Sequence, residues 1–149
     1  MDIKSDKFLP DISRILKKKY SKKEIPWIKM AILEALKSTH RCKHGCVIVN
    51  NNKIVGKGHN RCLGKKNGLK TYHAEKVALK RCDNKNLRGA SMYIIRLNLE
   101  FYNICQRTND LSNFTGVSIF EPSKPCIKCQ HMITKYQKRH NLTTIYYSI

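Results

Sequence analysis

The sequence has few acidic residues, few glycines and prolines, and no long apolar run. Asp and Glu number 10 against 30 Lys and Arg in 149 residues, which gives a formal net charge of +20. With 7 Gly and 4 Pro, the chain is neither fibrous nor of low complexity. No apolar stretch is long enough to cross a bilayer, and Met1–Pro10 lacks the apolar region of a signal peptide. We therefore expect an intracellular, cytoplasmic globular protein that does not contact a membrane.

Charge and cysteine usage narrow the expected chemistry. An odd count of 7 Cys in an intracellular chain is more typical of metal ligands or small buried residues than of disulfides. The excess of positive charge favours a partner or substrate that carries phosphate, although a solvated surface that reflects biased codon usage is the alternative. Residues 1–24 form a basic N-terminal segment, in which lysines cluster over residues 17–23. Its solvent-facing lysines are expected to be Lys17, Lys18, Lys19, Lys22 and Lys23.

Helical and strand patterns alternate along the chain, and no internal repeat is present. Helices are predicted over residues 11–23, 26–37, 72–81 and 126–139. Strands are predicted over residues 45–50, 54–59, 91–97 and 143–148, with a short extra strand over 116–120. Between about 98 and 115 no periodicity predicts an element. This alternation and the chain length predict a single α/β domain, residues 1–149, in which helices cover a central sheet.

Two motifs at predicted helix starts carry the chemistry. They are His73-Ala74-Glu75 and Pro125-Cys126-Ile127-Lys128-Cys129. Two Cys separated by two residues can direct both sulfurs at one ion, and a His from a second helix start can supply a third ligand. Three protein ligands and an open position are typical of catalytic zinc. We therefore predict a Zn²⁺ cofactor held by His73, Cys126 and Cys129; buried thiols and a capped core histidine are the alternative.

Glu75 is the predicted catalytic residue. It lies two residues beyond His73, where its carboxylate can take a proton from metal-bound water and deliver it to a substrate. A non-catalytic zinc-containing module that binds nucleic acid has no need of a carboxylate beside an open metal position. Glu75 thus favours an enzyme over such a module.

The pairing of His-x-Glu with Pro-Cys-x-x-Cys is a signature of zinc deaminases. Over residues 39–148 the chain resembles the cytidine and deoxycytidylate deaminase superfamily, which includes tRNA adenosine deaminases. The strand that ends in Gly58-His59-Asn60 belongs to this likeness, as do the two motif helices and the strand at 91–97. The resemblance implies a three-layer α/β/α fold with a central mixed sheet of four or five strands. It also implies that Asn60 hydrogen-bonds a sugar hydroxyl of the substrate.

Two departures from the family's pattern affect the edge of the sheet. The stretch between the motifs is about twenty residues longer than in compact members, which predicts an insertion at residues 98–121. Family members usually continue beyond the strand that corresponds to residues 143–148, adding a helix and a fifth strand. An apolar edge with Ile145, Tyr146 and Tyr147 needs cover, so the insertion or another subunit of a homo-oligomer is expected to supply it.

The resemblance implies hydrolytic deamination of a nucleobase with release of ammonia. The tRNA adenosine enzymes usually have Glu directly before Pro-Cys and a small residue after the second Cys, where this chain has Lys124 and Gln130. This difference favours cytosine in a nucleoside or nucleotide as the substrate. A base within RNA or DNA is the alternative.

A second metal site is a further hypothesis. His40, Cys42, His44 and Cys46 alternate, so on an extended strand they would share one face. The competing interpretation is that Cys46 is a small buried residue and that His40 and Cys42 lie in a loop before the sheet.

Overall fold

A computed structural model of the protein describes residues 12–63, 70–107 and 118–148. The main helices are α2 (Ile25–Leu36), α3 (Ala74–Arg81), α4 (Leu99–Arg107) and α5 (Ile127–His140), with a short 3-10 helix, η1 (Asn84–Asn86). The strands are β1 (His44–Asn50), β2 (Lys53–His59), β3 (Arg61–Leu63), β4 (Lys70–Tyr72), β5 (Ser91–Leu97), β6 (Phe120–Glu121) and β7 (Thr144–Tyr147). Residues 12–16 are also helical.

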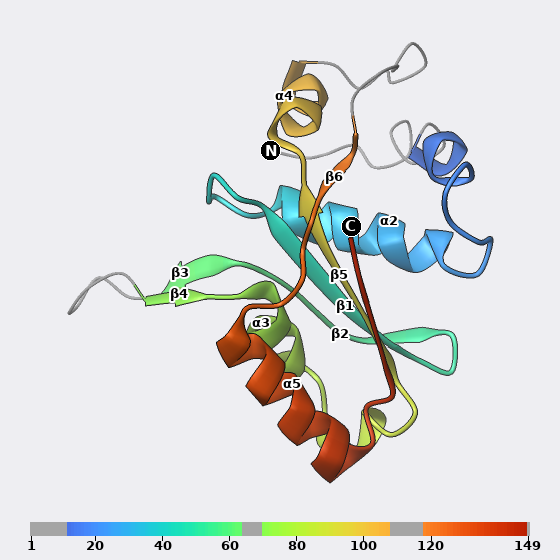
Figure 1. The fold of residues 1–149 in the computed structure, drawn as a ribbon, viewed down its shortest axis with the longest axis vertical. Helices are drawn as coiled ribbons and strands as arrows, with labels where there is room; N and C mark the ends of the chain where they lie inside the picture. The colour runs from blue at the N-terminus through green and yellow to red at the C-terminus, as the bar shows by residue number, and fades with distance from the viewer. Residues whose placement is uncertain (1–11, 64–69, 108–117, 149) are drawn as a thin grey trace.

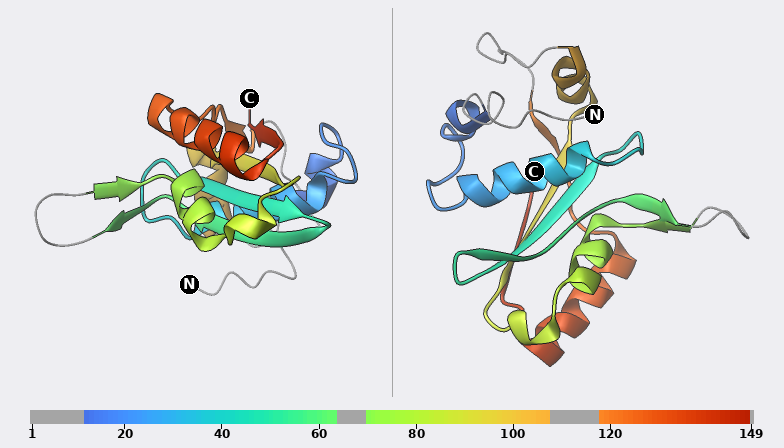
Figure 2. Two further views of the ribbon diagram at one scale, coloured as in Figure 1. Left: turned by 90° about the horizontal axis from the view of Figure 1, so that it is seen from below. Right: turned by 180° about the vertical axis from the view of Figure 1, so that it is seen from behind.

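The main sheet is mixed and has five strands, as the resemblance implied. β1 pairs antiparallel with both β2 and β5. On the other side of β5, β6 pairs antiparallel at Arg96 and Leu97, and β7 pairs parallel along Ser91–Ile94. A separate antiparallel hairpin, β3–β4, extends away from the main sheet beside α3, as Figures 1 and 2 show.

Alternating side chains on the central strands build two cores. Val47 and Val49 of β1 belong to the core that contains the apolar face of α2. Cys46 and Ile48, which point to the opposite face, belong to the core of α3 and α5. The helices therefore cover both faces of the sheet (Figure 1), which confirms the three-layer α/β/α architecture.

Two glycines allow the helices to approach the sheet closely. A Cβ at Gly45 would lie 2.0 Å from the backbone oxygen of Ala31 in α2. A Cβ at Gly58 would lie 2.7 Å from the backbone nitrogen of Ala78 in α3. Because these positions have no side chain, α2 and α3 can pack directly against the backbone of the sheet. This close packing places the start of α3 near the ends of β1 and β2.

Most predicted elements are confirmed within a few residues. The β1–β2 turn has left-handed backbone at Asn51 and Asn52, with φ of 49° and 58°, as the asparagine-rich turn predicted. The N-terminal helix is shorter than expected, because helical structure ends at residue 16 and turns follow. The lysines predicted to face solvent are exposed: Lys17, Lys18, Lys19, Lys22 and Lys23.

Several short elements were not predicted correctly. Helix α4 lies in the stretch between about 98 and 115, where no element was predicted. The β3–β4 hairpin was missed. The short extra strand lies at Phe120–Glu121 rather than over 116–120; residues 116 and 117 are outside the described part of the chain, as are residues 1–11 of the basic segment and 108–117 of the expected insertion.

The outer edge of β7 has no partner strand among the described residues. Tyr146 and Tyr147 are exposed on it. The described part of the expected insertion does not cover this edge, since α4 buries Phe101 in the α2-side core. In the described part of the chain, no helix is both long enough and apolar enough to span a membrane.

Candidate active site

The three predicted metal ligands meet where two helices begin. His73 is the N-cap of α3 and Cys126 is the N-cap of α5, both with extended backbone, and Cys129 lies in the first turn of α5. The Nδ1 atom of His73 lies 3.5 Å from the Sγ of Cys126 and 3.3 Å from the Sγ of Cys129. Free N–H groups at the helix N-termini carry partial positive charge, which favours thiolate ligands there.

This donor set fits zinc. With Zn–S of about 2.3 Å and Zn–N of about 2.1 Å, tetrahedral angles separate a sulfur from a nitrogen by about 3.6 Å. The two observed separations of 3.5 and 3.3 Å are close to this value. Within the described ranges, His73, Cys126 and Cys129 are the only group of three or more possible ligands whose atoms come this close together, all within 4.8 Å.

Burial shapes the electrostatics of the site. It raises the pKa of the Cys129 thiol, and the neighbouring Glu75 carboxylate and Cys126 thiol raise that pKa further. Ionisation of Cys129 therefore needs a strong local positive charge, which a divalent cation between the ligands supplies. Burial also raises the pKa of Glu75, although a backbone hydrogen bond at its own position and the charge of His73 act in the opposite direction.

Glu75 faces a cavity of about 280 Å³ beside the ligands. The carboxylate lies in the first turn of α3 and is 4% exposed. Side chains from the loop before β1, the end of β2, the end of β4 and the loop before α5 complete the wall. The lining residues are Cys42, His44, Asn60, Thr71, His73, Glu75, Ser123, Lys124 and Cys126.

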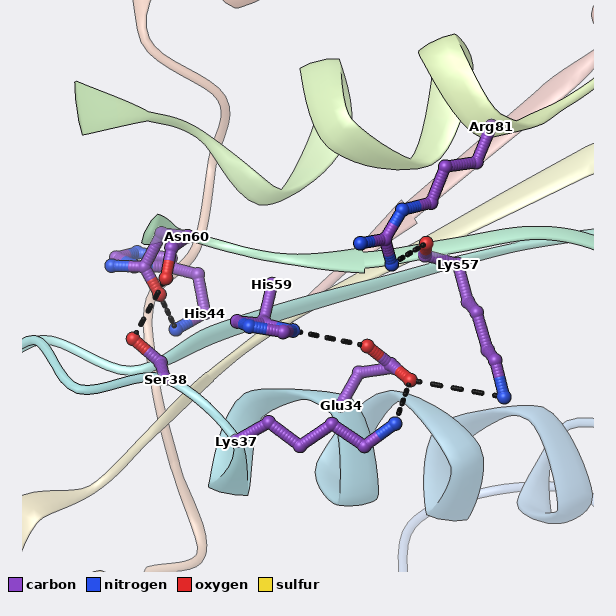
Figure 3. Close-up of polar contacts among 8 residues, drawn as sticks. All are labelled: Glu34, Lys37, Ser38, His44, Lys57, His59, Asn60 and Arg81. Atoms are coloured by element: carbon purple, nitrogen blue, oxygen red, sulfur yellow. Dashed lines mark hydrogen bonds and ion pairs between the residues drawn. The ribbon is translucent and has the colours of Figure 1, made fainter. Parts of the chain in front are cut away.

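Asn60 fastens the loop before β1 to the end of β2 (Figure 3). Its Oδ1 accepts a hydrogen bond of 2.9 Å from the backbone nitrogen of His44, and its Nδ2 donates one of 2.7 Å to the carbonyl of Cys42. The hydroxyl of Ser38 donates to the Asn60 carbonyl at 3.0 Å. Asn60 thus lines the cavity while its amide orders the loop, and its contact with a sugar hydroxyl stays a prediction.

His44 presents a neutral imidazole to the cavity. Burial, the charge of Arg96 and the nearby His73 lower the pKa of His44 to about 4, although a hydrogen bond to the backbone of Cys42 opposes the shift. At neutral pH the ring therefore offers hydrogen bonds without a charge.

Ser123 anchors the loop that leads into the second motif. The Ser123 hydroxyl donates to the Ile94 carbonyl of β5 at 2.9 Å, and the backbone nitrogen of Ser148 donates to the Ser123 oxygen at 2.8 Å. These buried bonds hold the next residues, Lys124 and Pro125, beside the sheet and so fix the start of α5.

The four residues of the hypothetical second metal site do not gather. Cys46 is fully buried on β1, as the competing interpretation predicted. The Nε2 atom of His40 instead lies 3.3 Å from the Sγ of Cys62, and Arg96 contacts the Sγ of Cys42 at 3.4 Å. No cluster of three possible ligands includes any of them in the part of the chain that is described.

Sequence reasoning missed several residues of the cavity wall, namely Cys42, His44, Thr71, Ser123 and Lys124. Ser123 and Lys124 directly precede Pro125-Cys126, so their adjacency to the motif was an available signal. His44 is the first residue of β1, and Thr71 lies in the unpredicted β3–β4 hairpin. Only the tertiary fold brings these two residues to the site.

The fold and the site together are those of a zinc-binding deaminase. The sequence model for the "Cytidine and deoxycytidylate deaminase zinc-binding region" matches residues 21–144. The chain therefore belongs to the cytidine and deoxycytidylate deaminase family.

Solved structures show the same fold. The dCMP deaminase from the cyanophage S-TIM5 in apo form aligns with a TM-score of 0.58 at 18% identity, covering 86% of this chain and 83% of that one. The same enzyme in complex with dCMP and dUMP aligns with a TM-score of 0.55 at 19% identity and the same coverage. No curated protein matches the sequence significantly.

Proposed function

We propose that the protein is a zinc-dependent hydrolase that deaminates cytosine in a nucleotide, with His73, Cys126 and Cys129 as ligands and Glu75 as the proton carrier. The observation that carries this proposal is the buried Glu75 carboxylate beside three converging metal donors, facing one cavity. A structural zinc site needs neither an open position nor a buried acid next to it.

Zinc supplies the Lewis acidity that activates water. The Glu75 carboxylate accepts the proton that water loses and transfers it to N3 of the cytosine ring, which makes C4 electrophilic. The oxygen of the deprotonated water bonds to C4. The proton of the resulting hydroxyl group then passes through Glu75 to the exocyclic amine, and the bond between C4 and this amine breaks to release ammonia and leave uracil. Because burial keeps bulk water from Glu75, these proton transfers stay between carboxylate and substrate.

Lys124 favours a nucleotide over a nucleoside. It is the only side chain with a fixed positive charge among the described residues that line the cavity, since His44 is neutral. We propose that its ammonium binds the substrate's phosphate. Lys124→Gln should then raise the KM for dCMP about tenfold or more, as expected for loss of a charge-assisted hydrogen bond, and leave the KM for deoxycytidine unchanged. Equal changes for both substrates would assign Lys124 to general shaping of the cavity.

The catalytic assignment is tested by Glu75→Gln. Gln has nearly the same shape but accepts no proton, so the variant should keep its fold and about one zinc per chain while turnover falls by about 10²–10⁴. Zinc is measured by elemental analysis and turnover by ammonia release from cytidine, dCMP, guanine and single-stranded oligonucleotides. Glu100→Gln, which changes an exposed carboxylate on α4, is the matched control. Activity of Glu75→Gln within tenfold of wild type would contradict the role of Glu75.

A further inference from the structure

A second hollow lies beside the predicted metal ligands His73 and Cys129, and Lys124 is not among its lining residues. It measures about 610 Å³, and its walls include Tyr72 from the end of β4, Lys76 of α3, and Lys128 and Met132 of α5. We call it the basic hollow. Thr71 and His73 line both the basic hollow and the catalytic cavity, so the two spaces adjoin at the predicted metal site.

Lysines gather around an aromatic ring at the rim of this hollow. The Nζ of Lys76 lies 4.5 Å from the centre of the Tyr72 ring, and the Nζ of Lys80 lies 4.7 Å from it. Lys128 of α5 lines the same hollow. Among the described residues, no acidic side chain lines the hollow, and none of these lysines forms an ion pair.

The Tyr72 ring offsets part of the charge of Lys76 and Lys80, but the ammonium groups still repel one another. Lys76 and Lys80 are four residues apart on one helix, where like charges repel each other. Lys128 adds a third ammonium across the hollow. An anion between the three would relieve this repulsion, and the chain, with its net charge of +20, has few carboxylates of its own to provide one.

The combination of ring and lysines matches a single-stranded polynucleotide. Proteins that bind single strands place aromatic rings where bases stack and lysines where the backbone passes, and every base has a face that can stack. In a duplex the bases are already stacked on one another, so they cannot reach a half-buried ring such as Tyr72. An acidic peptide would satisfy the lysines but would leave the ring without a planar partner.

We propose that the basic hollow binds the part of a single-stranded polynucleotide that adjoins the base in the catalytic cavity. Phosphates of the strand contact Lys76, Lys80 and Lys128 and draw a lysine away from the Tyr72 ring, so that one base stacks on the ring face it leaves. The consequence for catalysis rests on the proposed function, because it extends the substrate from a free nucleotide to a cytosine within a strand. Binding itself does not depend on deamination and is measured separately.

The test uses the zinc-loaded protein and a labelled oligothymidylate of about 15 nucleotides, which contains no cytosine and is not turned over. Each single-strand phosphate contact contributes about 0.7 to the slope of log affinity against log salt, so three lysines contribute about 2. Between about 50 and 200 mM salt, wild-type affinity should therefore fall about 16-fold more than that of the variant Lys76→Gln/Lys80→Gln/Lys128→Gln. Elemental analysis checks that this variant keeps zinc, since the Lys76 charge acts on Cys129.

The matched control is Lys53→Gln/Lys85→Gln/Lys138→Gln. It removes the same charge from exposed lysines that do not line the hollow: Lys53 at the start of β2, Lys85 in η1 and Lys138 in the last turn of α5. Its salt slope should stay within about 0.5 of wild type, which separates local contacts from net charge. A slope reduced equally in both triple variants would overturn the proposal, because the effect would then come from overall charge.

The ring is tested with Tyr72→Ala. Loss of one stacked base should weaken oligothymidylate binding about tenfold while leaving an abasic oligonucleotide of equal length unaffected. Equal effects on both oligonucleotides, or a slope that flattens only when Lys17, Lys18, Lys19, Lys22 and Lys23 become Gln, would refute the basic hollow as the binding surface. Turnover of dCMP is assayed in parallel. Activity on dCMP without oligonucleotide binding refutes only this inference, and binding without any deamination refutes only the proposed function.

Discussion

Glu34 is a buried carboxylate that links α2 to β2, and its removal gives a measurable test of the fold (Figure 3). Its side chain is 2% exposed and accepts hydrogen bonds from Lys37 Nζ at 2.6 Å and from His59 Nδ1 at 3.2 Å. Lys57 Nζ lies 3.9 Å away. Because His59 directly precedes Asn60, this cluster supports the end of β2 that lines the catalytic cavity. We predict that Glu34→Gln destabilises the protein without removing zinc.

The expected loss of folding free energy depends on how exposed the partners of Glu34 are. Lys37 and Lys57 are 52% and 46% exposed, so solvent screens their pairing with Glu34 and each contributes about 0.2–1 kcal/mol. The less exposed His59 contributes about 1 kcal/mol or more through its hydrogen bond to the carboxylate. Gln keeps the volume and opens no cavity. The expected loss of about 2 kcal/mol corresponds to a fall in Tm of about 4–8 °C for a domain of this size.

The effect should depend on pH in a defined direction. Burial alone would raise the pKa of Glu34, but hydrogen bonds from Lys37 and His59 and the charges of Lys37 and Lys57 outweigh it, so the pKa lies below its ordinary value. A lowered pKa in the folded state stabilises the fold above the unfolded-state pKa of about 4.3, and this stabilisation is lost as pH falls through the folded-state pKa. The difference between wild type and Glu34→Gln should be full at pH 7 and shrink in acid.

Thermal unfolding followed by circular dichroism at pH 7, 5 and 3 measures this difference, with Glu100→Gln as the control for net charge. Glu100 is exposed and its carboxylate has no ion pair with any described residue, so the control should match wild type at each pH. The reasoning is refuted if Glu34→Gln melts within about 1 °C of wild type at pH 7. It is refuted equally if the difference is the same at all pH values, which would show that shape and not charge is responsible.

Two further predictions concern the metal and the packing of α2. Cys126→Ala and Cys129→Ala should each lose stoichiometric zinc, because the sulfurs of Cys126 and Cys129 contact His73. The control Cys62→Ala should keep its zinc, and elemental analysis after dialysis measures the zinc content of all three variants. Gly45→Ala should destabilise the protein by about 1–3 kcal/mol in urea unfolding, since the new Cβ meets the backbone of Ala31 at 2.0 Å and a helix backbone cannot yield locally. An unchanged urea midpoint would show that α2 can move away from the sheet.

The parts of the fold that the sequence predicted are those in which local pattern and tertiary environment agree. β1 and β5 are apolar on both faces because helices cover both, and such runs are recognisable. The two motifs were sufficient to single out the three side chains that the structure brings together as possible metal ligands, since each lies within one turn of a helix start that proline or a polar break had marked.

The missed elements lack that agreement. In α4 only Phe101 is fully buried, so the sequence of this helix does not show the repeating apolar positions from which a helix is predicted. β3 and β4 have three residues each and pair only with each other, which is below the length at which alternation can be read. The cavity wall was missed for a different reason: Thr71 and His44 are distant in sequence from both motifs and reach the site only through pairing of strands.

α4 is connected to the site through a lysine. Lys43 is buried, and its ammonium donates hydrogen bonds to the carbonyls of Ser38 and His40 while lying 4.2 Å from the centre of the Tyr102 ring of α4. Burial lowers the pKa of Lys43, so the aromatic ring and the carbonyls compensate a charge that is partly desolvated. The loop that Lys43 closes leads directly into His44 and the cavity. Through the contact between Tyr102 and Lys43, α4 therefore stabilises the loop that leads into the cavity, although no residue of α4 lines the cavity itself.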